Sequence, residues 1–301
     1  MVGGVNLADL KANPAVIPQL VAHQRIRVSE LRPASEVACG AQLWTLDDGA
    51  RLFAKSRAGA PAGFFTAEAS GLNWLTETCS VRVPEVIAAL KELLVLRWVQ
   101  PGEPTRAGAR ELGIQLAAMH HNTDADMFGA PPGVGLERGF VGVLPLDNTP
   151  CSDWAQFYVT RRLEPYLRRA RDHGALDCEQ AGELVALLDK VPDRAGPPER
   201  PAQIHGDLWS GNVHYDDAGH PWLVDAAAAH LGHRETDLAT LRLFGAPFLA
   251  DTLLGYNERY RLADGWPERI ALHQLHLLLV HVVIFGGSYV GQTLQAARAL
   301  R

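Results

Sequence analysis

Three oxygen-bearing side chains stand at a fixed spacing between positions 207 and 225 of this 301-residue chain. The segment His205–Asn212 reads His-Gly-Asp-Leu-Trp-Ser-Gly-Asn, so that Asp207 and Asn212 are five residues apart. Asp225 follows thirteen residues later and closes the short apolar run Trp222–Val224. Gly, Asn and Asp favour turns for their own backbone reasons, but a turn alone does not explain the distant carboxylate. The pattern therefore predicts a loop and a strand end that bring these oxygen atoms to one site.

The chemistry of these groups favours phosphoryl transfer. Protein kinases place an Asp and an Asn at this spacing in their catalytic loop, and a second Asp at the end of a nearby strand. We therefore expect Asp207 to be the catalytic residue that accepts the proton of the attacking hydroxyl. We expect Asn212 and Asp225 to bind Mg²⁺, a hard cation that prefers oxygen ligands.

The local sequence is more specific than the spacing, because His205–Asn212 resembles the signature of the fructosamine kinase (ketosamine-3-kinase) family. That family belongs to the aminoglycoside-phosphotransferase-like branch of the protein-kinase fold. The resemblance covers nearly the whole chain and is least exact in the N-terminal third. It continues through Phe128-Gly129, Asp153-Trp154, Phe157, Arg161-Arg162-Leu163, Gly232-His233-Arg234-Glu235, Asp237-Leu238-Ala239, Phe244-Gly245, Gln274-Leu275, His281 and Phe285-Gly286-Gly287-Ser288-Tyr289.

This resemblance implies an α+β, bilobal protein-kinase-like fold. A small β-rich lobe would span residues 1–97, and a larger, mainly helical lobe would span residues 98–301, with a hinge near 97–102. ATP would lie in the cleft with its adenine against the hinge residues Arg97, Trp98 and Val99.

The order of the sequence patterns agrees with this expectation. The segments Leu43–Leu46 and Arg51–Lys55 flank the turn Asp47–Gly49 and predict a hairpin over 43–55. A helix is predicted over 66–78 and a buried strand over 93–99, and the later apolar residues mostly recur at helical spacing.

A kinase also needs a cation on the nucleotide phosphates. Lys55 closes the second strand of the predicted hairpin, where the family has Phe-Val-Lys and this chain has Phe53-Ala54-Lys55. Glu68 follows thirteen residues later and would form an ion pair that fixes the ammonium group. The alternative is that Lys55 and Glu68 are two solvated surface residues.

The nucleotide-covering turn departs from the family pattern. It falls at 37–42 and retains Gly40 alone, although glycine allows close backbone approach to a phosphate. Cys39 in this turn is either a redox-sensitive thiol or an unreactive small residue. A second departure is Asp225-Ala226-Ala227, where the family commonly has Asp-Pro-Ala; we expect a softer backbone there.

The acceptor implied by the resemblance is a small or protein-linked ketosamine of the ribulosamine or fructosamine type. Its phosphorylation at O3 gives an unstable product that releases the amine, which is a deglycation repair. Trp209 is either a platform for the sugar or a packing residue. His233 and Glu235 either shape the acceptor pocket or stabilise the loop, and His281 is either an acceptor-side residue or a core histidine. His205 is expected to be structural.

Composition narrows the remaining classes. The net charge of −6 argues against a nucleic-acid partner. The four cysteines form no C-x-x-C pair, which favours a reducing cytoplasm over a disulfide framework. The N-terminus shows no secretory signal, and the apolar stretch 272–285 is expected to be too short and too polar for a membrane span. A cytoplasmic monomer or homodimer is expected.

Three alternatives stay open. An aminoglycoside-type or choline-type kinase would share the residues at 207, 212 and 225. A non-catalytic pseudokinase would explain the eroded glycine turn. A metal-dependent hydrolase could draw on His205, Asp207, His214, His230 and His233, although their spacing fits no zinc pattern.

Overall fold

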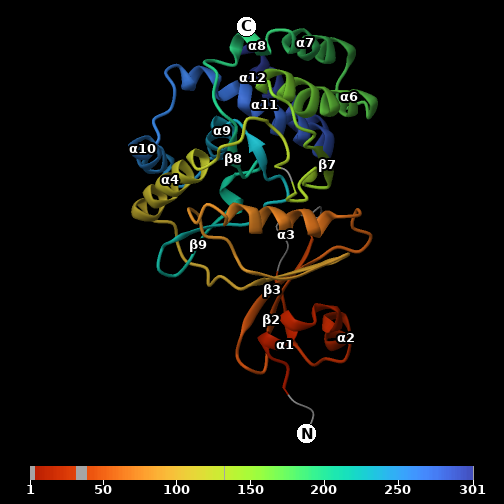
Figure 1. Ribbon diagram of the computed structural model, residues 1–301. Helices are drawn as coiled ribbons and strands as arrows, with labels where there is room; N and C mark the ends of the chain where they lie inside the picture. Colours follow the sequence, from red (N-terminus) through yellow and green to blue (C-terminus); the bar gives the residue numbers. More distant parts are fainter. Residues whose placement is uncertain (1–3, 32–38, 132, 301) are drawn as a thin grey trace.

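The computed structural model describes residues 4–31, 39–131 and 133–300. A β-sheet lies in the N-terminal lobe, and most of the helices lie in the C-terminal lobe (Figure 1). The α+β, bilobal fold expected from the sequence is therefore confirmed.

The N-terminal lobe is built on a five-stranded antiparallel sheet in the order β1-β2-β3-β5-β4. Its strands are β1 (Arg27–Leu31), β2 (Gly40–Thr45), β3 (Arg51–Ser56), β4 (Val86–Leu90) and β5 (Leu93–Arg97). The predicted hairpin is formed by β2 and β3, which pair from Gly40↔Ser56 to Thr45↔Arg51. The predicted strand over 93–99 is β5, which ends at Arg97.

The two faces of the sheet carry different layers, because successive side chains of a strand point to opposite faces. Leu52 and Ala54 of β3 belong to a core that includes Leu10 and Ile17. Those two residues come from α1 (Leu7–Ala12) and α2 (Ile17–Ala22), short helices joined by a 3₁₀ turn (Pro14–Val16) that the sequence patterns did not predict. They lie at the end of the lobe farthest from the C-terminal lobe (Figure 1).

The other face of the sheet is covered by α3 (Phe64–Leu75), the helix predicted over 66–78. This helix runs between the sheet and the C-terminal lobe (Figure 1). It approaches that lobe closely at Gly71, where a Cβ atom would lie 1.9 Å from the carbonyl oxygen of Ala226. Only glycine permits this contact, which joins α3 to the chain one residue beyond Asp225.

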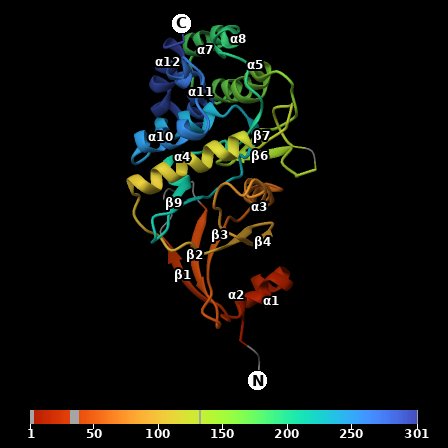
Figure 2. The same cartoon turned by 60° about the vertical axis from the view of Figure 1, so that its left-hand side comes forward.

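Over its described residues, the C-terminal lobe consists of helices and three short strand pairs. The helices are α4 (Arg106–His121), α5 (Trp154–Phe157), a π-helix (Tyr158–Leu163), α6 (Glu164–Asp172), α7 (Cys178–Leu188), α8 (Val191–Arg194), α9 (Glu235–Leu243), α10 (Leu249–Arg259), α11 (Trp266–Phe285) and α12 (Val290–Arg298), with 3₁₀ turns at Ser210–Asn212 and Gly286–Tyr289. The strand pairs are β6 (Arg138–Val141) with β7 (Leu144–Asp147), β8 (Ala202–Ile204) with β11 (His230–Gly232), and β9 (Val213–Tyr215) with β10 (Pro221–Leu223). Figure 2 shows α4 alongside α10.

The apolar helical segment near the C-terminus is longer than the stretch 272–285 identified from the sequence. The helical stretch Trp266–Arg298 is long and apolar enough to cross a membrane by length and composition alone, so the expectation that 272–285 is too short was wrong. Half of its most apolar window is nevertheless buried inside the protein, and Leu272, Leu275 and Leu279 belong to the core of the C-terminal lobe. This burial is typical of the core helix of a globular lobe.

Candidate active site

Two short antiparallel strands bring Asp225 to the loop that carries Asp207. Leu223 of β10 pairs with Val213 of β9, and the Val224 amide then donates a hydrogen bond to the Asn212 carbonyl oxygen at 3.1 Å. The Asn212 side-chain amide donates to the carbonyl oxygen of Asp207 at 2.8 Å. The nitrogen of this carboxamide therefore braces the loop, and its oxygen is the atom suited to a cation.

Asp237, a residue of α9, binds the backbone of the loop that carries Asp207. Its carboxylate accepts hydrogen bonds from the amides of His205 at 2.8 Å and Gly206 at 2.9 Å. It also contacts Nε2 of His120 in α4 at 3.2 Å. Burial opposes ionisation, but the contacts with His120 and His205 together outweigh it and hold the pKa of Asp237 below its usual range. No functional role was predicted for Asp237 and His120; the only signal was the Asp-Leu-Ala segment within the family resemblance.

His205 joins the two halves of this site. Its Nε2 atom lies 2.8 Å from the Val224 carbonyl oxygen, one residue before Asp225. Its side chain is fully buried, so it is not placed to contact a substrate. The neighbouring Gly206 adopts φ +81°, and a Cβ atom there would lie 2.2 Å from the Ala228 carbonyl oxygen. The loop therefore needs glycine before Asp207.

Lys55 lies between two carboxylates from different elements. Its Nζ atom is 2.8 Å from Oε2 of Glu68 in α3 and 3.0 Å from Oδ1 of Asp225. The side chains of Lys55 and Glu68 are only 14% and 3% exposed, so the solvated-surface alternative does not describe them. Burial lowers the pKa of Lys55, but the charges of Asp225 and Glu68 outweigh it and raise that pKa above its usual value. Lys55 is thus held as a cation at the junction of the lobes.

Glu68 is buried next to the ammonium group of Lys55. Burial, assisted by the negative charge of Asp225, raises the pKa of Glu68 to about 7, and the ammonium of Lys55 acts in the opposite direction. The pair is therefore held together in a site with little water, where a charge interaction is weakly screened.

Asp225 adopts a left-handed backbone conformation with φ +60°. Such a conformation is uncommon outside glycine, although Asp tolerates it better than most residues, and it is often found at functional sites. Its side chain is 46% exposed, so the carboxylate that contacts Lys55 is also open to solvent. The following Ala226, which stands where the family commonly has proline, is fully buried against Gly71.

Asp207 is a carboxyl group that retains its proton more firmly than an ordinary Asp. Burial raises its pKa to about 8, and the negative charges of Asp225 and Asp237 act in the same direction against the charge of Lys55. A pKa near the working pH suits a residue that accepts a proton during the reaction.

The residues expected at the nucleotide base lie at the junction between the lobes. Arg97 ends β5, and Trp98 and Val99 follow it, all three half-buried. The Trp98 amide donates to the carbonyl oxygen of Arg51 at 3.1 Å. The Gly102 amide donates to the Tyr215 carbonyl oxygen at 2.7 Å, which ties this connection to β9.

The nucleotide-covering turn is described only in part, because positions 37 and 38 lie outside the described residues. Gly40 begins β2 and pairs with Ser56. Cys39 is a half-buried free thiol. Burial raises the pKa of Cys39 despite the nearby charge of Lys55, which disfavours the reactive thiolate form.

Trp209 and His281, two of the expected substrate residues, lie on one aromatic surface. The Trp209 side chain is 38% exposed, and its ring packs edge-on against Phe244 with centroids 6.0 Å apart. Phe244 in turn lies 5.1 Å from the ring of His281 in α11. This surface begins two residues beyond Asp207.

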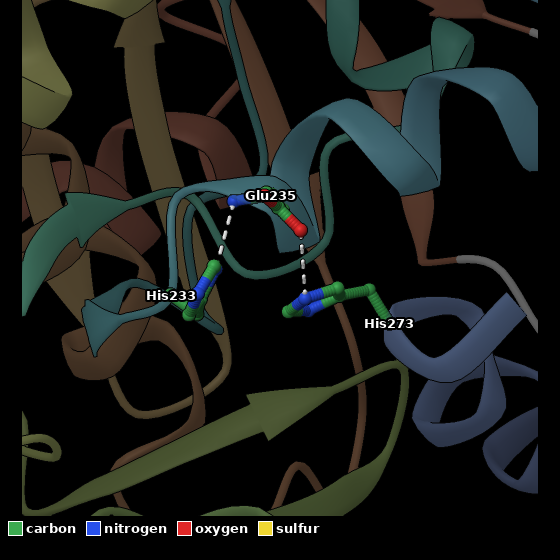
Figure 3. Close-up of side chains that lie close together, drawn as sticks. All are labelled: His233, Glu235 and His273. Carbon is green, nitrogen blue, oxygen red and sulfur yellow. Dashed lines mark hydrogen bonds and ion pairs between the residues drawn. The ribbon is translucent and has the colours of Figure 1, made fainter. Parts of the chain in front are cut away.

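His233 and Glu235 lie elsewhere, in a buried cluster with His273 (Figure 3). Both oxygens of Glu235 accept hydrogen bonds from the Arg269 guanidinium, at 2.9 and 2.6 Å. Burial raises the pKa of Glu235, but His273 and Arg269 outweigh it and lower the pKa to about 2. His233 and Glu235 are 3% and 1% exposed, so the geometry favours their structural alternative over a place in the acceptor pocket.

The ligand pool of a metal-dependent hydrolase is not brought together. His205 and His230 each contact a backbone carbonyl oxygen, of Val224 and Ala228 respectively, at 2.8 Å. Among the described residues, the one group with metal-binding spacing contains His233 alone from that pool. In that group, the carboxylate oxygens are already occupied by Arg269.

The Asp207 loop, the oxygen-bearing side chains of Asn212 and Asp225, and the Lys55–Glu68 ion pair between two lobes form the arrangement expected of a phosphotransferase of the protein-kinase-like class. Solved aminoglycoside phosphotransferases share this fold. APH(4)-Ia is 15% identical and has a TM-score of 0.61, with 96% of this chain and 99% of that chain covered.

The particular family follows from the sequence comparisons. Residues 15–300 match the family model described as Fructosamine kinase, and the chain belongs to that family. The crystal structure of a "putative fructosamine-3-kinase" from Thermobifida fusca is 44% identical, has a TM-score of 0.84, and covers 91% of this chain and 93% of its own. The Enterococcus faecium protein named "Probable ketoamine kinase" is 32% identical over 95% of each chain. The mouse protein Ketosamine-3-kinase is 30% identical over 84% of this chain and 89% of its own.

Proposed function

We propose that this protein is an ATP-dependent kinase that phosphorylates a sugar hydroxyl, O3, of a ketosamine. The observation that carries the proposal is the convergence of Lys55, Asp207, Asn212 and Asp225 at the junction of the lobes. These groups come from β3, the catalytic loop and the end of β10, and only folding brings them together.

Each residue has a distinct role in this proposal. Lys55 binds the nucleotide phosphates, and Glu68 holds its ammonium in position. Asn212 and Asp225 are the ligands of Mg²⁺, because both side chains offer oxygen atoms and the carboxylate of Asp225 lies beside Lys55. When bound, the metal neutralises charge on the phosphates. Asp207 orients the acceptor hydroxyl and accepts its proton.

The nucleotide would lie between residues 1–97 and residues 98–301, which we propose as the two lobes, with the hinge near 97–102. Its adenine would lie against Arg97, Trp98 and Val99, and Gly40 would begin the strand that covers the phosphates. This placement leaves the surface beyond Asp207 for the acceptor.

The acceptor is proposed to be a ribulosamine or a fructosamine, either small or linked to a protein. The names of the relatives support this class: Ketosamine-3-kinase in mouse, and Protein-ribulosamine 3-kinase in Arabidopsis thaliana, which is 30% identical over 80% of this chain and 73% of its own. Trp209 offers the sugar a rigid apolar face with one N–H donor, and His281 lies on the same aromatic surface. Release of the amine from the unstable 3-phosphate would make the reaction a deglycation repair. We place it in the cytoplasm, as a monomer or homodimer.

A substrate screen tests this proposal. ATP consumption is measured with ribulosamines, erythrulosamines, fructosamines, aminoglycosides and choline, with the Asp207→Asn protein as the blank. We expect ADP and a sugar 3-phosphate to form only when a ketosamine is present. If only aminoglycosides or choline are phosphorylated, the proposed ketosamine acceptor is wrong. If no acceptor is phosphorylated, a non-catalytic binding protein is favoured.

A further inference from the structure

A pocket of about 470 Å³ opens beside the catalytic loop, and it includes Trp209. Its rim includes Trp209–Gly211 of the loop, Pro101 and Pro104 between β5 and α4, and Ala246 and Pro247 after α9, and residues of α4, β9 and α9 complete its walls. Asp207, Lys55 and Asp225 do not line it. The pocket is therefore adjacent to the reacting groups without containing them.

We propose that this pocket binds an apolar substituent on the amine of the ketosamine. The inference rests on the proposed function and adds a preference among ketosamines that share the same sugar. The sugar would remain at Asp207 and Trp209, and the group carried by the nitrogen would enter the pocket.

The covalent structure of a ketosamine supports this arrangement. Four bonds separate the O3 oxygen from the amine nitrogen on C1, so the two atoms are at most roughly 5 Å apart. Any substituent on that nitrogen must therefore leave the site within one side chain's length of Asp207. Trp209 stands two residues along the chain from Asp207, and the pocket begins at Trp209.

The chemistry of the walls selects an apolar group. Leu112, Val213 and Leu241 are buried residues that line the pocket, and prolines line it as well. Among the residues described as lining it, none is Asp, Glu, Lys or Arg. Pockets with such walls gain affinity from apolar surface removed from water, whereas a phosphate or a carboxylate finds no Lys or Arg there, and burial lowers the pKa of the lining His214.

The wall formed by Trp209 is positioned by its surroundings. A Cβ atom on Gly211 would lie 2.2 Å from the Trp209 ring, so the ring packs directly on the glycine backbone. Phe244 contacts the ring edge-on. A ring held in this way forms a wall before the acceptor arrives, which lowers the entropic cost of binding.

The test compares two ketosamines that carry the same sugar, one made from methylamine and one from phenethylamine. Removing a phenyl group from water should favour the larger acceptor in kcat/KM by about tenfold or more in the wild-type protein. Ala246→Phe fills the pocket with a ring and should remove this preference, leaving kcat/KM for the methylamine compound and the KM for ATP within about twofold of wild type. Ala246→Leu should remove part of it.

The Ala246 amide donates to the carbonyl oxygen of Leu241, a backbone hydrogen bond that both substitutions retain. The matched control is Ala186→Phe, which fills a separate pocket of about 290 Å³ lined by Lys190 and by residues of α7 and α12. It should keep the full preference. Thermal unfolding of all variants separates misfolding from a filled pocket.

Each outcome has a defined meaning. Turnover of the methylamine compound without a preference for phenethylamine would overturn the pocket assignment and leave the kinase assignment intact. A rise in the KM for ATP alone would assign the pocket to the nucleotide. If neither ketosamine is phosphorylated, the proposed function and this inference fail together.

Discussion

Asp237→Asn tests whether a residue outside the reacting groups positions the catalytic loop. The substitution keeps the size of the side chain. The NH₂ group of the new asparagine, however, must face one of the backbone N–H groups that now donate to the carboxylate. An unsatisfied buried donor costs about 1–3 kcal/mol, and the remaining bonds lose the extra strength of a charged acceptor. The amides of His205 and Gly206 both depend on this carboxylate. We therefore expect a loss of about 3 kcal/mol in the free energy of unfolding.

The assay has two readouts. Thermal unfolding should show a decrease in Tm of about 6 °C, since about 2 °C per kcal/mol is appropriate for a chain of this size. At a temperature where the variant remains folded, kcat should fall by a larger factor than the KM for ATP rises, because the displaced loop carries Asp207 and Asn212 whereas Lys55 stays on β3. The matched control is Asp264→Asn on the surface, whose side chain is 97% exposed and should change neither readout. Wild-type kcat in a folded Asp237→Asn protein would refute the positioning role.

Four further outcomes are expected from the catalytic groups. Asp207→Asn should retain the fold and ATP binding but lose phosphoryl transfer, so near wild-type turnover would contradict the assigned role. Asp225→Ala removes a charge and a coordinating oxygen and should abolish productive Mg–ATP binding, which a calorimetric titration would detect. Because burial raises the pKa of Asp207 to about 8 and the base must be ionised, kcat/KM should fall as the pH decreases below that value; a profile flat from pH 6 to 9 would count against it. Trp209→Ala should lower kcat/KM for the ketosamine and leave the KM for ATP near its original value, whereas equal losses would indicate collapse of the loop.

Local sequence patterns predicted the parts of the fold that depend on neighbouring residues. The hairpin of β2 and β3 follows from two segments that flank a short turn, and α3 follows from helical spacing. The convergence of Asp207, Asn212 and Asp225 could be predicted because β9 and β10 form a hairpin within the same short segment.

The remaining features depend on partners that are distant in the sequence. Asp237 contacts His120 across 117 residues, and no local pattern identifies such a pair. His233 and Glu235 occur in a motif that the sequence alone could place in a pocket or in the core. Their burial became apparent only through Arg269 and His273, which come from another helix. The helices α1 and α2 are too short to give a clear periodic signal.

The close contact between Gly71 and Ala226 sets how near the two lobes approach each other. The backbone of α3 packs there directly on a carbonyl oxygen of the chain that carries Asp225, so any side chain at position 71 would push the two segments apart. Glu68 lies three residues before Gly71 in α3 and binds Lys55, which also contacts Asp225. A larger residue at position 71 would therefore disturb the distance from Lys55 to Asp225, so the absence of a side chain at one position of α3 sets the spacing of charged groups that come from both lobes.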